Sequence, residues 1–170
     1  DPAALWPEAR FAGSAVPVTI VADTSEPELP YDGELTALDG LRPGDVPLFV
    51  VEEGVRCASW GELFSCAALG RGAAGVVVDG YVRDAAAITA LGFPTFARGL
   101  SPLDTFARAV VTGIDVEARA GDETLIRAGG DVVIGGAWDN SLMLRDTVTG
   151  QRYSGIDGRA LGFRQPCIRW

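Results

Sequence analysis

Two aspartates and an arginine lie close together just after the most apolar run of the chain. Asp79 directly follows the valines at 76–78, and Arg83 and Asp84 come a few positions later. The apolar run is typical of a buried strand, and α/β folds bind ligands at the carboxyl ends of such strands. An arginine can hold a carboxylate through two parallel hydrogen bonds, and an aspartate can hold a divalent cation directly or through water. The sequence therefore predicts a site for an anionic substrate and a metal ion.

Each of these residues also has an ordinary structural interpretation. Asp84 is placed to cap the helix after it, Arg83 to form a surface ion pair, and Asp79 to accept the N–H groups of a turn. Glu62 follows Ser59 at the spacing of a capping box, in which both side chains cap the start of one helix. Taken one at a time, the residues leave the structural and the functional interpretations open.

All the basic residues of the chain are arginines. The sequence contains no lysine and no histidine, and its formal net charge is −9 at pH 7. The absence of lysine excludes Schiff-base aldolase chemistry and P-loops, and the absence of histidine excludes Ser-His-Asp triads and imidazole metal ligands. Oxygen ligands remain, and these favour Mg²⁺ or Mn²⁺ over Zn²⁺. The acidic balance also argues against direct binding of nucleic acid, which usually needs a basic surface.

The composition indicates one globular domain. The chain has 170 residues, of which 48% are hydrophobic, enough to bury a sizeable core. Polar residues interrupt every apolar run before it reaches the roughly 18 residues of a membrane span, and no signal-peptide pattern is visible. The cysteines, Cys57, Cys66 and Cys167, lack metal-site spacing, and Cys66 is expected in the core. Free thiols in a reducing compartment are the simplest interpretation, so we expect a cytoplasmic protein.

Strands and helices are expected to alternate over the first hundred residues. The strands are expected at 16–22, 46–52, 76–78 and 93–99, and the helices between 59 and 71 and over 85–91. The acidic segment 23–34 is expected to be a mobile surface loop. After residue 101, short apolar runs and glycine turns are typical of an antiparallel sheet. This order predicts an α/β fold with a partly parallel sheet.

A long run closely resembles one protein family. The run Trp60–Pro102, WGELFSCAALGRGAAGVVVDGYVRDAAAITALGFPTFARGLSP, is similar to the RraA-like family, with shorter matches in ARFAGSAVPV, RPGDV and AGDETLIRAGGDVVIGG. The family holds the regulator of ribonuclease activity A and the class II 4-hydroxy-4-methyl-2-oxoglutarate/4-carboxy-4-hydroxy-2-oxoadipate aldolases. The resemblance implies an α/β/β sandwich of the swivelling phosphohistidine-domain type, with mixed sheets, assembled as a homotrimer.

The resemblance also implies roles for individual residues. In the family's aldolases a divalent metal lies near the aspartate of an RD pair, and the arginine binds the pyruvyl group; here these are Asp84 and Arg83. Asp79 and Gly80 match an Asp-Gly pair that the family's catalytic members carry. The implied substrate-binding residues at the helix start are Gly61, Glu62, Leu63 and Phe64. The implied activity is an Mg²⁺- or Mn²⁺-dependent lyase that cleaves or decarboxylates a small 2-oxo acid, oxaloacetate included, through a pyruvate enolate.

The chain departs from the family pattern at its ends. The GSAVPV strand stands near the start, where the family has preceding helices, and the tail SGIDGRALGFRQPCIRW resembles the segment expected before that strand. We therefore expect a single domain over 1–170 in which 150–170 correspond to the family's N-terminal segment, as in a circular permutation. Arg127 replaces an often acidic residue, and Gly135 replaces the usual proline. These changes leave the second half of any site between subunits unassigned.

Two other functions remain open. One is a non-catalytic regulator that binds an RNA-processing enzyme, because an acidic protein suits a basic partner surface. The other is a repurposed cyclase or tailoring enzyme of a biosynthetic pathway, whose pocket would be more apolar than a pyruvate site. The presence of both Asp79 and Asp84 favours the lyase.

Overall fold

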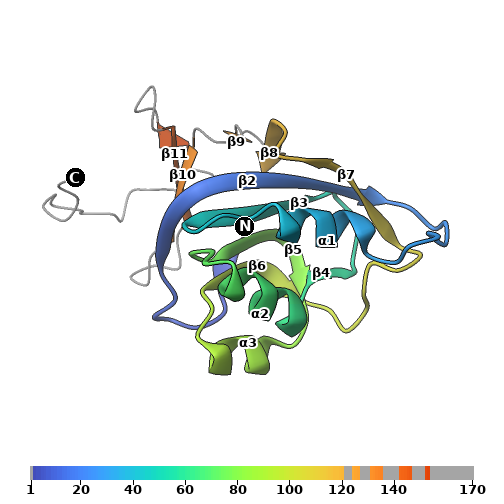
Figure 1. Cartoon of the computed structure of the whole chain (residues 1–170), viewed down its shortest axis with the longest axis horizontal. Helices are drawn as coiled ribbons and strands as arrows, with labels where there is room; N and C mark the ends of the chain where they lie inside the picture. Colours follow the sequence, from blue (N-terminus) through green and yellow to red (C-terminus); the bar gives the residue numbers. More distant parts are fainter. Residues whose placement is uncertain (1, 121–123, 127–130, 136–141, 147–151, 154–170) are drawn as a thin grey trace, which may run out of the picture.

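The computed structural model describes residues 2–120, 124–126, 131–135, 142–146 and 152–153 (Figure 1). The helices are α1 (Asp32–Asp39), α2 (Glu62–Gly70) and α3 (Ala85–Leu91). The strands are β1 (Ala3–Ala4), β2 (Phe11–Ala22), β3 (Asp45–Val51), β4 (Ala58–Trp60), β5 (Val76–Val82), β6 (Thr95–Leu100), β7 (Ala109–Ile114), β8 (Ala118–Ala120), β9 (Thr124–Ile126), β10 (Asp131–Gly135), β11 (Leu142–Asp146) and β12 (Arg152–Tyr153).

Most of the strands belong to one mixed sheet. Its main order is β1-β6-β5-β3-β2-β10-β11-β12, with β4 paired to β5 and β7 paired to β2. The neighbours β6, β5, β3 and β2 run parallel, whereas β1, β7 and β10 are antiparallel to their partners. The long strand β2 pairs with β10 near its start and with β7 near its end. The predicted α/β fold with mixed strand directions is therefore confirmed.

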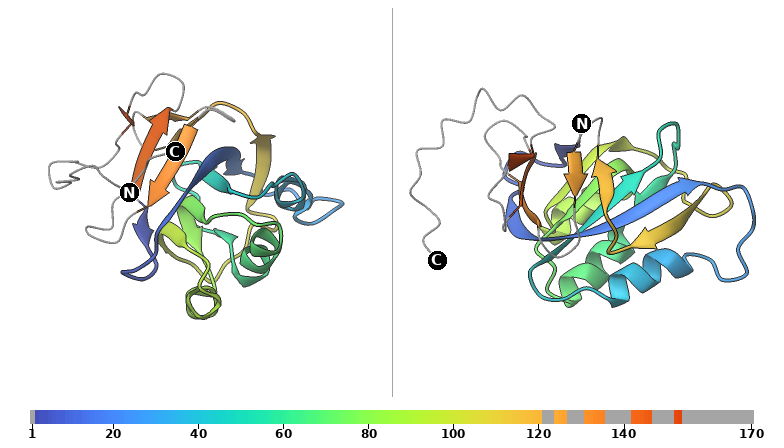
Figure 2. Two further views of the ribbon diagram at one scale, coloured as in Figure 1. Left: turned by 60° about the vertical axis from the view of Figure 1, so that its left-hand side comes forward. Right: turned by 90° about the horizontal axis from the view of Figure 1, so that it is seen from above.

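The three helices lie on one side of the sheet (Figure 2). Alternate side chains of the central strands face them: Val76 and Val78 of β5 pack in a cluster with Ala68 of α2 and Ile88 of α3. Val77 of the same strand packs in a second cluster. Because both faces of the parallel strands are covered, these strands are apolar along most of their length.

Strand β5 is longer than its sequence suggests. The prediction ended this strand at residue 78, but it continues through Asp79 and Gly80 to Val82. The reason is tertiary: Asp79 pairs with Val50 of β3, and Val82 pairs with Leu100 of β6. Pairing with β3 and β6 thus keeps this polar segment in an extended strand. It also places Arg83 and Asp84, which follow the strand, at the edge of the sheet beside α2.

Helix α1 lies partly within the segment predicted as a loop. The helix buries Ala37 and Leu38, and its Gly33 faces Val111 of β7 so closely that an added Cβ would lie 2.5 Å from Val111 Cβ. Packing against β7, which is distant in sequence, therefore stabilises a segment whose local pattern is weak. By contrast, the helix predicted over 85–91 is confirmed as α3.

The predictions for the chain ends lie largely outside the described residues. The segment 154–170, which includes Cys167, is not among them, nor is Arg127, so the proposed permutation stays a prediction. Gly135 ends β10. Within the described residues, no helix is both long and apolar enough to cross a membrane.

Candidate functional site

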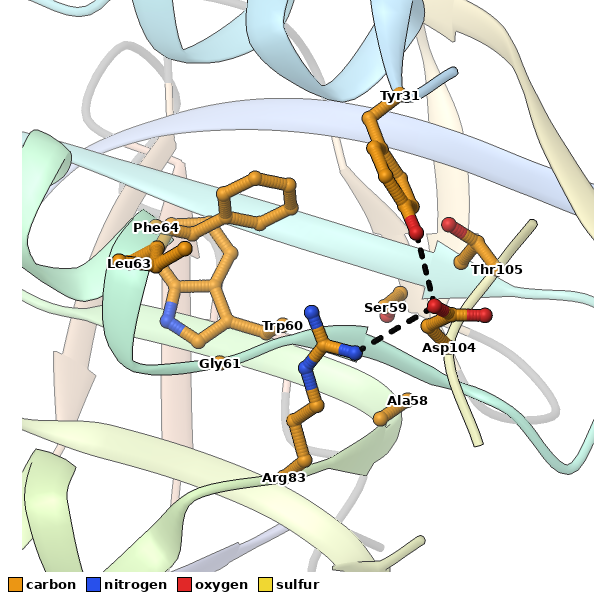
Figure 3. Close-up of a pocket in the computed structure, with 10 residues that line it drawn as sticks. All are labelled: Tyr31, Ala58, Ser59, Trp60, Gly61, Leu63, Phe64, Arg83, Asp104 and Thr105. Atoms are coloured by element: carbon orange, nitrogen blue, oxygen red, sulfur yellow. Dashed lines mark hydrogen bonds and ion pairs between the residues drawn. The ribbon is translucent and has the colours of Figure 1, made fainter. Parts of the chain in front are cut away.

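A pocket lies where β4 leads into α2, beside the end of β5 (Figure 3). It is lined by Tyr31, Ala58, Ser59, Trp60, Gly61, Leu63, Phe64, Arg83, Asp104 and Thr105. Its volume is ≈ 90 Å³, several times the space that one water molecule needs. The pocket therefore has room for part of a small organic molecule and not only for water.

The start of α2 supplies backbone donors to this pocket. The helix begins after Gly61, which makes no side-chain cap, and its first backbone hydrogen bond runs from Ser65 N to Gly61 O at 3.0 Å. The N–H groups of Leu63 and Phe64 precede this bond and so have no acceptor within the helix. Such groups, with the helix dipole, favour a bound anion.

The capping-box interpretation of Ser59 and Glu62 is wrong. Ser59 belongs to β4, and the N-cap position of α2 falls on Gly61 instead. Ser59 is 2% exposed, and its Oγ is buried without a hydrogen-bond partner among the described residues. Figure 3 shows this side chain at the back of the pocket, between Arg83 and Thr105. A buried hydroxyl without a partner is costly, and a ligand in the pocket could provide one.

Gly61 permits a close approach between the helix start and the end of β5. A Cβ at this position would lie 2.8 Å from Asp84 Oδ2 and 3.0 Å from Arg83 Cγ. The backbone of Gly61 is extended, with φ −159°, a conformation that any residue adopts. The position therefore needs glycine because a larger residue would clash, not because of its backbone angles. Without a side chain at Gly61, Arg83 and Asp84 can pack against the helix start.

Arg83 and Asp84 both turn toward α2. Asp84 Oδ2 accepts a hydrogen bond from Glu62 N at 3.2 Å and lies 3.7 Å from Arg83 Nε. The alternative in which Asp84 caps its own helix, α3, is wrong, because its side chain makes no cap hydrogen bond there. Its backbone is left-handed, with φ 59°, a strained conformation for a non-glycine residue and one that is frequent at functional sites.

Asp104 and Tyr31 join Arg83 from elements that lie far away in the sequence. Arg83 Nη1 is 3.7 Å from Asp104 Oδ2, and the same oxygen accepts a hydrogen bond of 2.8 Å from the Tyr31 hydroxyl. Arg108 Nη1 lies 3.1 Å from the other oxygen, Oδ1. The hydrogen bond to Asp104 raises the pKa of the Tyr31 phenol, and desolvation adds to the rise. Tyr31 is therefore a neutral donor at neutral pH.

Trp60 forms an apolar wall that fixes the helix start. It is 1% exposed, and its Nε1 donates to Ser65 Oγ at 2.8 Å, while that hydroxyl donates to Gly61 O at 3.0 Å. The ring meets Phe64 edge-on, with centroids 5.7 Å apart. These contacts hold the first turn of α2 in place, so the donors at its start are positioned before any ligand binds.

Asp79 does not line this pocket. It is 3% exposed and forms an ion pair and hydrogen bond with Arg98 of β6, which raise the pKa of the Arg98 guanidinium. The structure thus brings together Arg83, Asp84 and the start of α2, and it places Asp79 in a separate pair. A catalytic role for Asp79 stays a prediction. Cys57 is buried, but Cys66 is exposed, so its placement in the core is wrong.

The donor set around Asp84 fits a loosely held Mg²⁺ or Mn²⁺. Within the described part of the chain, no group of three or more His, Cys, Asp or Glu side chains could hold a metal ion. Asp84 offers one half-exposed carboxylate, whose side chain is 43% exposed. Mg²⁺ is commonly held by only one or two protein carboxylates, with water and ligand oxygens completing its shell, so a single aspartate at this position is compatible with such an ion.

Sequence reasoning missed Tyr31, Asp104 and the pocket role of Ser59. Asp104 lies in the segment after β6, which ends at Leu100, so its place at the same sheet edge as Arg83 could have been inferred from the parallel strands. No local signal marks Tyr31, because it reaches the pocket from the segment before α1.

The chain matches a family model over residues 2–137, that of the RraA-like family, described as Aldolase/RraA. A structure described among novel cellulases from gut-associated microbes has a TM-score of 0.79 at 18% identity and covers 88% of this chain. RraAS2 of Streptomyces coelicolor is described as an unusual member of the RNase ES inhibitor RraA protein family. Its structure has a TM-score of 0.73 at 24% sequence identity, and the match covers 88% of this chain and 72% of RraAS2. The RNA-processing inhibitor RraA of Thermus thermophilus has a TM-score of 0.63 at 23% sequence identity, and the match covers 84% of this chain and 80% of that protein.

These likenesses show the fold alone, because every identity is below a quarter. The chain spans 65% of the length of the first of these structures. No curated protein matches the chain.

Proposed function

Because the chain belongs to the RraA-like (Aldolase/RraA) family, we propose that it is a cytoplasmic, divalent-metal-dependent lyase acting on a small 2-oxo acid. The family includes both ribonuclease regulators and metal-dependent aldolases. One observation carries the proposal: the Arg83 guanidinium lies beside the open N–H groups of α2 in a pocket of small volume (Figure 3). Donors from a helix start and from an arginine suit a carboxylate, which supports the proposal.

Binding of the substrate would start at the carboxylate and the 2-oxo group. The N–H groups of Leu63 and Phe64 and the Arg83 guanidinium offer donors from two directions, which fixes the orientation of a planar 2-oxo carboxylate. Asp84, held against Glu62 N and Arg83, would hold the metal ion on the same side of the pocket. When bound, Mg²⁺ or Mn²⁺ supplies Lewis-acid stabilisation of negative charge on the 2-oxo oxygen.

The proposed bond cleavage is a retro-aldol reaction or the related decarboxylation. In the retro-aldol case the C4 hydroxyl loses its proton and becomes a carbonyl, the C3–C4 bond breaks, and its electron pair gives pyruvate enolate. Protonation at C3 then yields pyruvate. Since the sequence contains neither histidine nor lysine, proton transfer would fall to water and to lining side chains such as Tyr31, Asp104 and Ser59.

The test is release of pyruvate from 4-hydroxy-2-oxopentanoate, 4-hydroxy-4-methyl-2-oxoglutarate and oxaloacetate, with Mg²⁺, Mn²⁺ or EDTA. We expect turnover that requires the metal and is lost in Asp84→Asn. The matched control is Asp39→Asn, because Asp39 also pairs with an arginine, Arg71, but on an exposed surface away from the pocket. Turnover that persists in EDTA would exclude metal dependence, and no release from any of the substrates would exclude the lyase.

The assembly proposed with this function is a homotrimer. Leu63 at the pocket mouth is 76% exposed and Leu100 at the end of β6 is 64% exposed, and large exposed apolar side chains favour a contact surface. Sedimentation of the whole chain checks this proposal, and a monomer at micromolar concentration would contradict it.

A non-catalytic regulator is the second candidate. The formal charge of −9 and the exposed leucines would suit a basic partner with apolar anchors. A stable complex with an RNA-processing enzyme, together with no pyruvate release, would favour it. The cyclase alternative required an apolar pocket. Trp60, Leu63 and Phe64 make much of the lining apolar, whereas Arg83 and Asp104 add charge to it, so this alternative stays a prediction.

A further inference from the structure

We propose that the pocket selects 2-oxo acids with a single carboxylate and an uncharged, hydroxyl-bearing remainder. This inference rests on the proposed function, because it places the 2-oxo carboxylate at Arg83 and the start of α2. It concerns the opposite end of the same pocket, formed by Tyr31, Asp104 and Thr105.

The pocket has two ends of different character (Figure 3). Gly61, Leu63 and Phe64 lie at one end, and Tyr31, Asp104 and Thr105 lie at the other. The Arg83 guanidinium lies between them, with Nη1 directed toward Asp104. A ligand whose carboxylate meets the helix start and Arg83 therefore extends its remaining atoms toward Tyr31 and Asp104.

The end of the pocket formed by Tyr31, Asp104 and Thr105 is acidic, and the arginines near Asp104 already form ion pairs with it. Asp104 is 30% exposed, and its neighbour in the chain, Thr105, donates a hydrogen bond of 2.7 Å from Oγ1 to Oε1 of the buried Glu34. Among the described residues, Arg83 and Arg108 form ion pairs with Asp104, and Arg108 contacts its Oδ1. A second carboxylate on the ligand would meet Asp104 without a cation of its own, and the like charges would repel.

Neutral polar groups, by contrast, find partners in this part of the pocket. Ser59 Oγ is buried without a partner among the described residues and can donate to or accept from a ligand hydroxyl. The Tyr31 hydroxyl donates to Asp104 and keeps its lone pairs for a ligand donor. The single proton of a ligand hydroxyl can go to Tyr31 or to Asp104, while the oxygen of that hydroxyl accepts from Ser59. A 4-hydroxyl group with an alkyl or hydroxyalkyl extension satisfies these groups and adds no charge.

Binding of two unreactive acids of equal chain length tests the selection without catalysis. 2-Oxopentanoate and 2-oxoglutarate share the 2-oxo carboxylate and differ in the far end, a methyl in one and a carboxylate in the other. Calorimetric titration of the whole chain with Mg²⁺ is expected to show 2-oxopentanoate binding about tenfold more tightly, since the repulsion near Asp104 opposes the second charge. Equal or tighter binding of 2-oxoglutarate would overturn the proposal, and so would binding of neither acid.

Asp104→Asn tests which group makes the selection. The substitution removes the charge and keeps the shape, so the affinity ratio of the two acids is expected to fall to about one. If the substitution also changes how firmly Arg83 is held, that change acts on the carboxylate that both acids share. It would therefore alter both affinities equally and leave their ratio unchanged. Asp39→Asn, on the distant surface, is the matched control and should keep the tenfold ratio. A ratio that survives in Asp104→Asn would overturn the assignment.

Turnover separates this inference from the function on which it rests. 4-Hydroxy-2-oxopentanoate is expected to release pyruvate faster than 4-hydroxy-4-methyl-2-oxoglutarate, and Ser59→Ala is expected to slow the former several-fold, through loss of a hydrogen bond to its hydroxyl. Faster release from the dicarboxylate would overturn the selection and keep the lyase. The binding preference without turnover would keep the selection and overturn the lyase.

Discussion

Two aspartate–arginine groups stand near the same strand and differ in their surroundings. Asp79 pairs with Arg98 across β5 and β6 and is 3% exposed. Asp84 and Arg83, just beyond the end of β5, are 43% and 37% exposed, and their separation of 3.7 Å is too long for a hydrogen bond. The residue types are the same. In the first pair the two side chains bond each other, whereas in the second Arg83 lines the pocket and Asp84 accepts from Glu62 N beside it.

The difference supports the proposal that Asp79 and Arg98 serve stability, whereas Arg83 and Asp84 serve chemistry. A buried carboxylate with a hydrogen-bonded arginine has little left to offer a ligand, and its loss leaves an unpaired charge. Arg83 shares its charge between Asp84 and Asp104 at longer range, so a substrate carboxylate can compete for it. The predictions below separate the two groups by measuring turnover and unfolding in the same variants.

The largest effect is expected on turnover in Arg83→Ala. The substitution removes the guanidinium beside α2, and the rate of pyruvate release should fall about 10²–10³-fold, the range seen when a donor to developing negative charge is lost. Arg98→Ala is the matched control, because it removes an arginine of similar exposure that lies outside the pocket lining. Steady-state kinetics check this. A larger loss in Arg98→Ala than in Arg83→Ala would reverse the roles of the two groups.

The next effect is expected on stability in Asp79→Ala. The substitution leaves Arg98 without its buried partner and should lower the free energy of unfolding by about 2 kcal/mol, less than for a fully buried pair because Arg98 is 36% exposed. Chemical denaturation measures this change. Asp84→Ala should change the unfolding free energy by less than about 1 kcal/mol. Equal losses in the two variants would remove the distinction between the groups.

A smaller effect is expected in Gly61→Ala. The new Cβ would lie 2.8 Å from Asp84 Oδ2, so Asp84 and Arg83 must shift by a few tenths of an ångström. Turnover should fall about tenfold, because misplaced binding groups reduce the population of reactive geometry. Gly70→Ala is the control, since open space surrounds that glycine on the same helix. Full activity in Gly61→Ala would show that the close approach is not needed.

The smallest effect is expected in Tyr31→Phe. The hydrogen bond to Asp104 raises the pKa of the Tyr31 phenol, so its contribution to stability is complete below the ordinary value of about 10 and is lost as the pH rises through the raised pKa. At neutral pH the variant should lose about 1 kcal/mol of unfolding free energy.

The pH dependence provides the check on Tyr31. The stability difference between the wild-type protein and Tyr31→Phe should shrink in alkaline buffer, and the tyrosinate absorbance lost in the variant should appear above pH ~10 in the wild type. Ionisation of Tyr31 below that value would contradict the hydrogen bond to Asp104.

Local patterns predicted the elements that carry their own signals. Helix α3 was predicted at 85–91 from a short alanine-rich run, and the RD pair was placed correctly at the end of β5. The capping box failed because Ser59 is held in β4 by pairing with β5, which moves the helix start to Gly61. Helix α1 was missed because its stability comes from β7, far away in sequence.

The site shows the same limit. Arg83, Asp84 and the first turn of α2 were found because one continuous run holds them. Tyr31 and Asp104 complete the pocket through contacts that only the folded chain creates. For this reason the side chains at the Tyr31–Asp104 end of the pocket, on which the proposed preference for a single carboxylate rests, could not be identified from the sequence.

A crystal structure with pyruvate and Mg²⁺ is the most direct test of the central claim, that Arg83 and the start of α2 hold the carboxylate of a 2-oxo acid. The account predicts carboxylate oxygens about 2.7–3.2 Å from an Arg83 guanidinium nitrogen and from the N–H of Leu63 or Phe64, with the metal ion on the side of Asp84. Pyruvate bound beside Arg98, or away from Arg83, would contradict it.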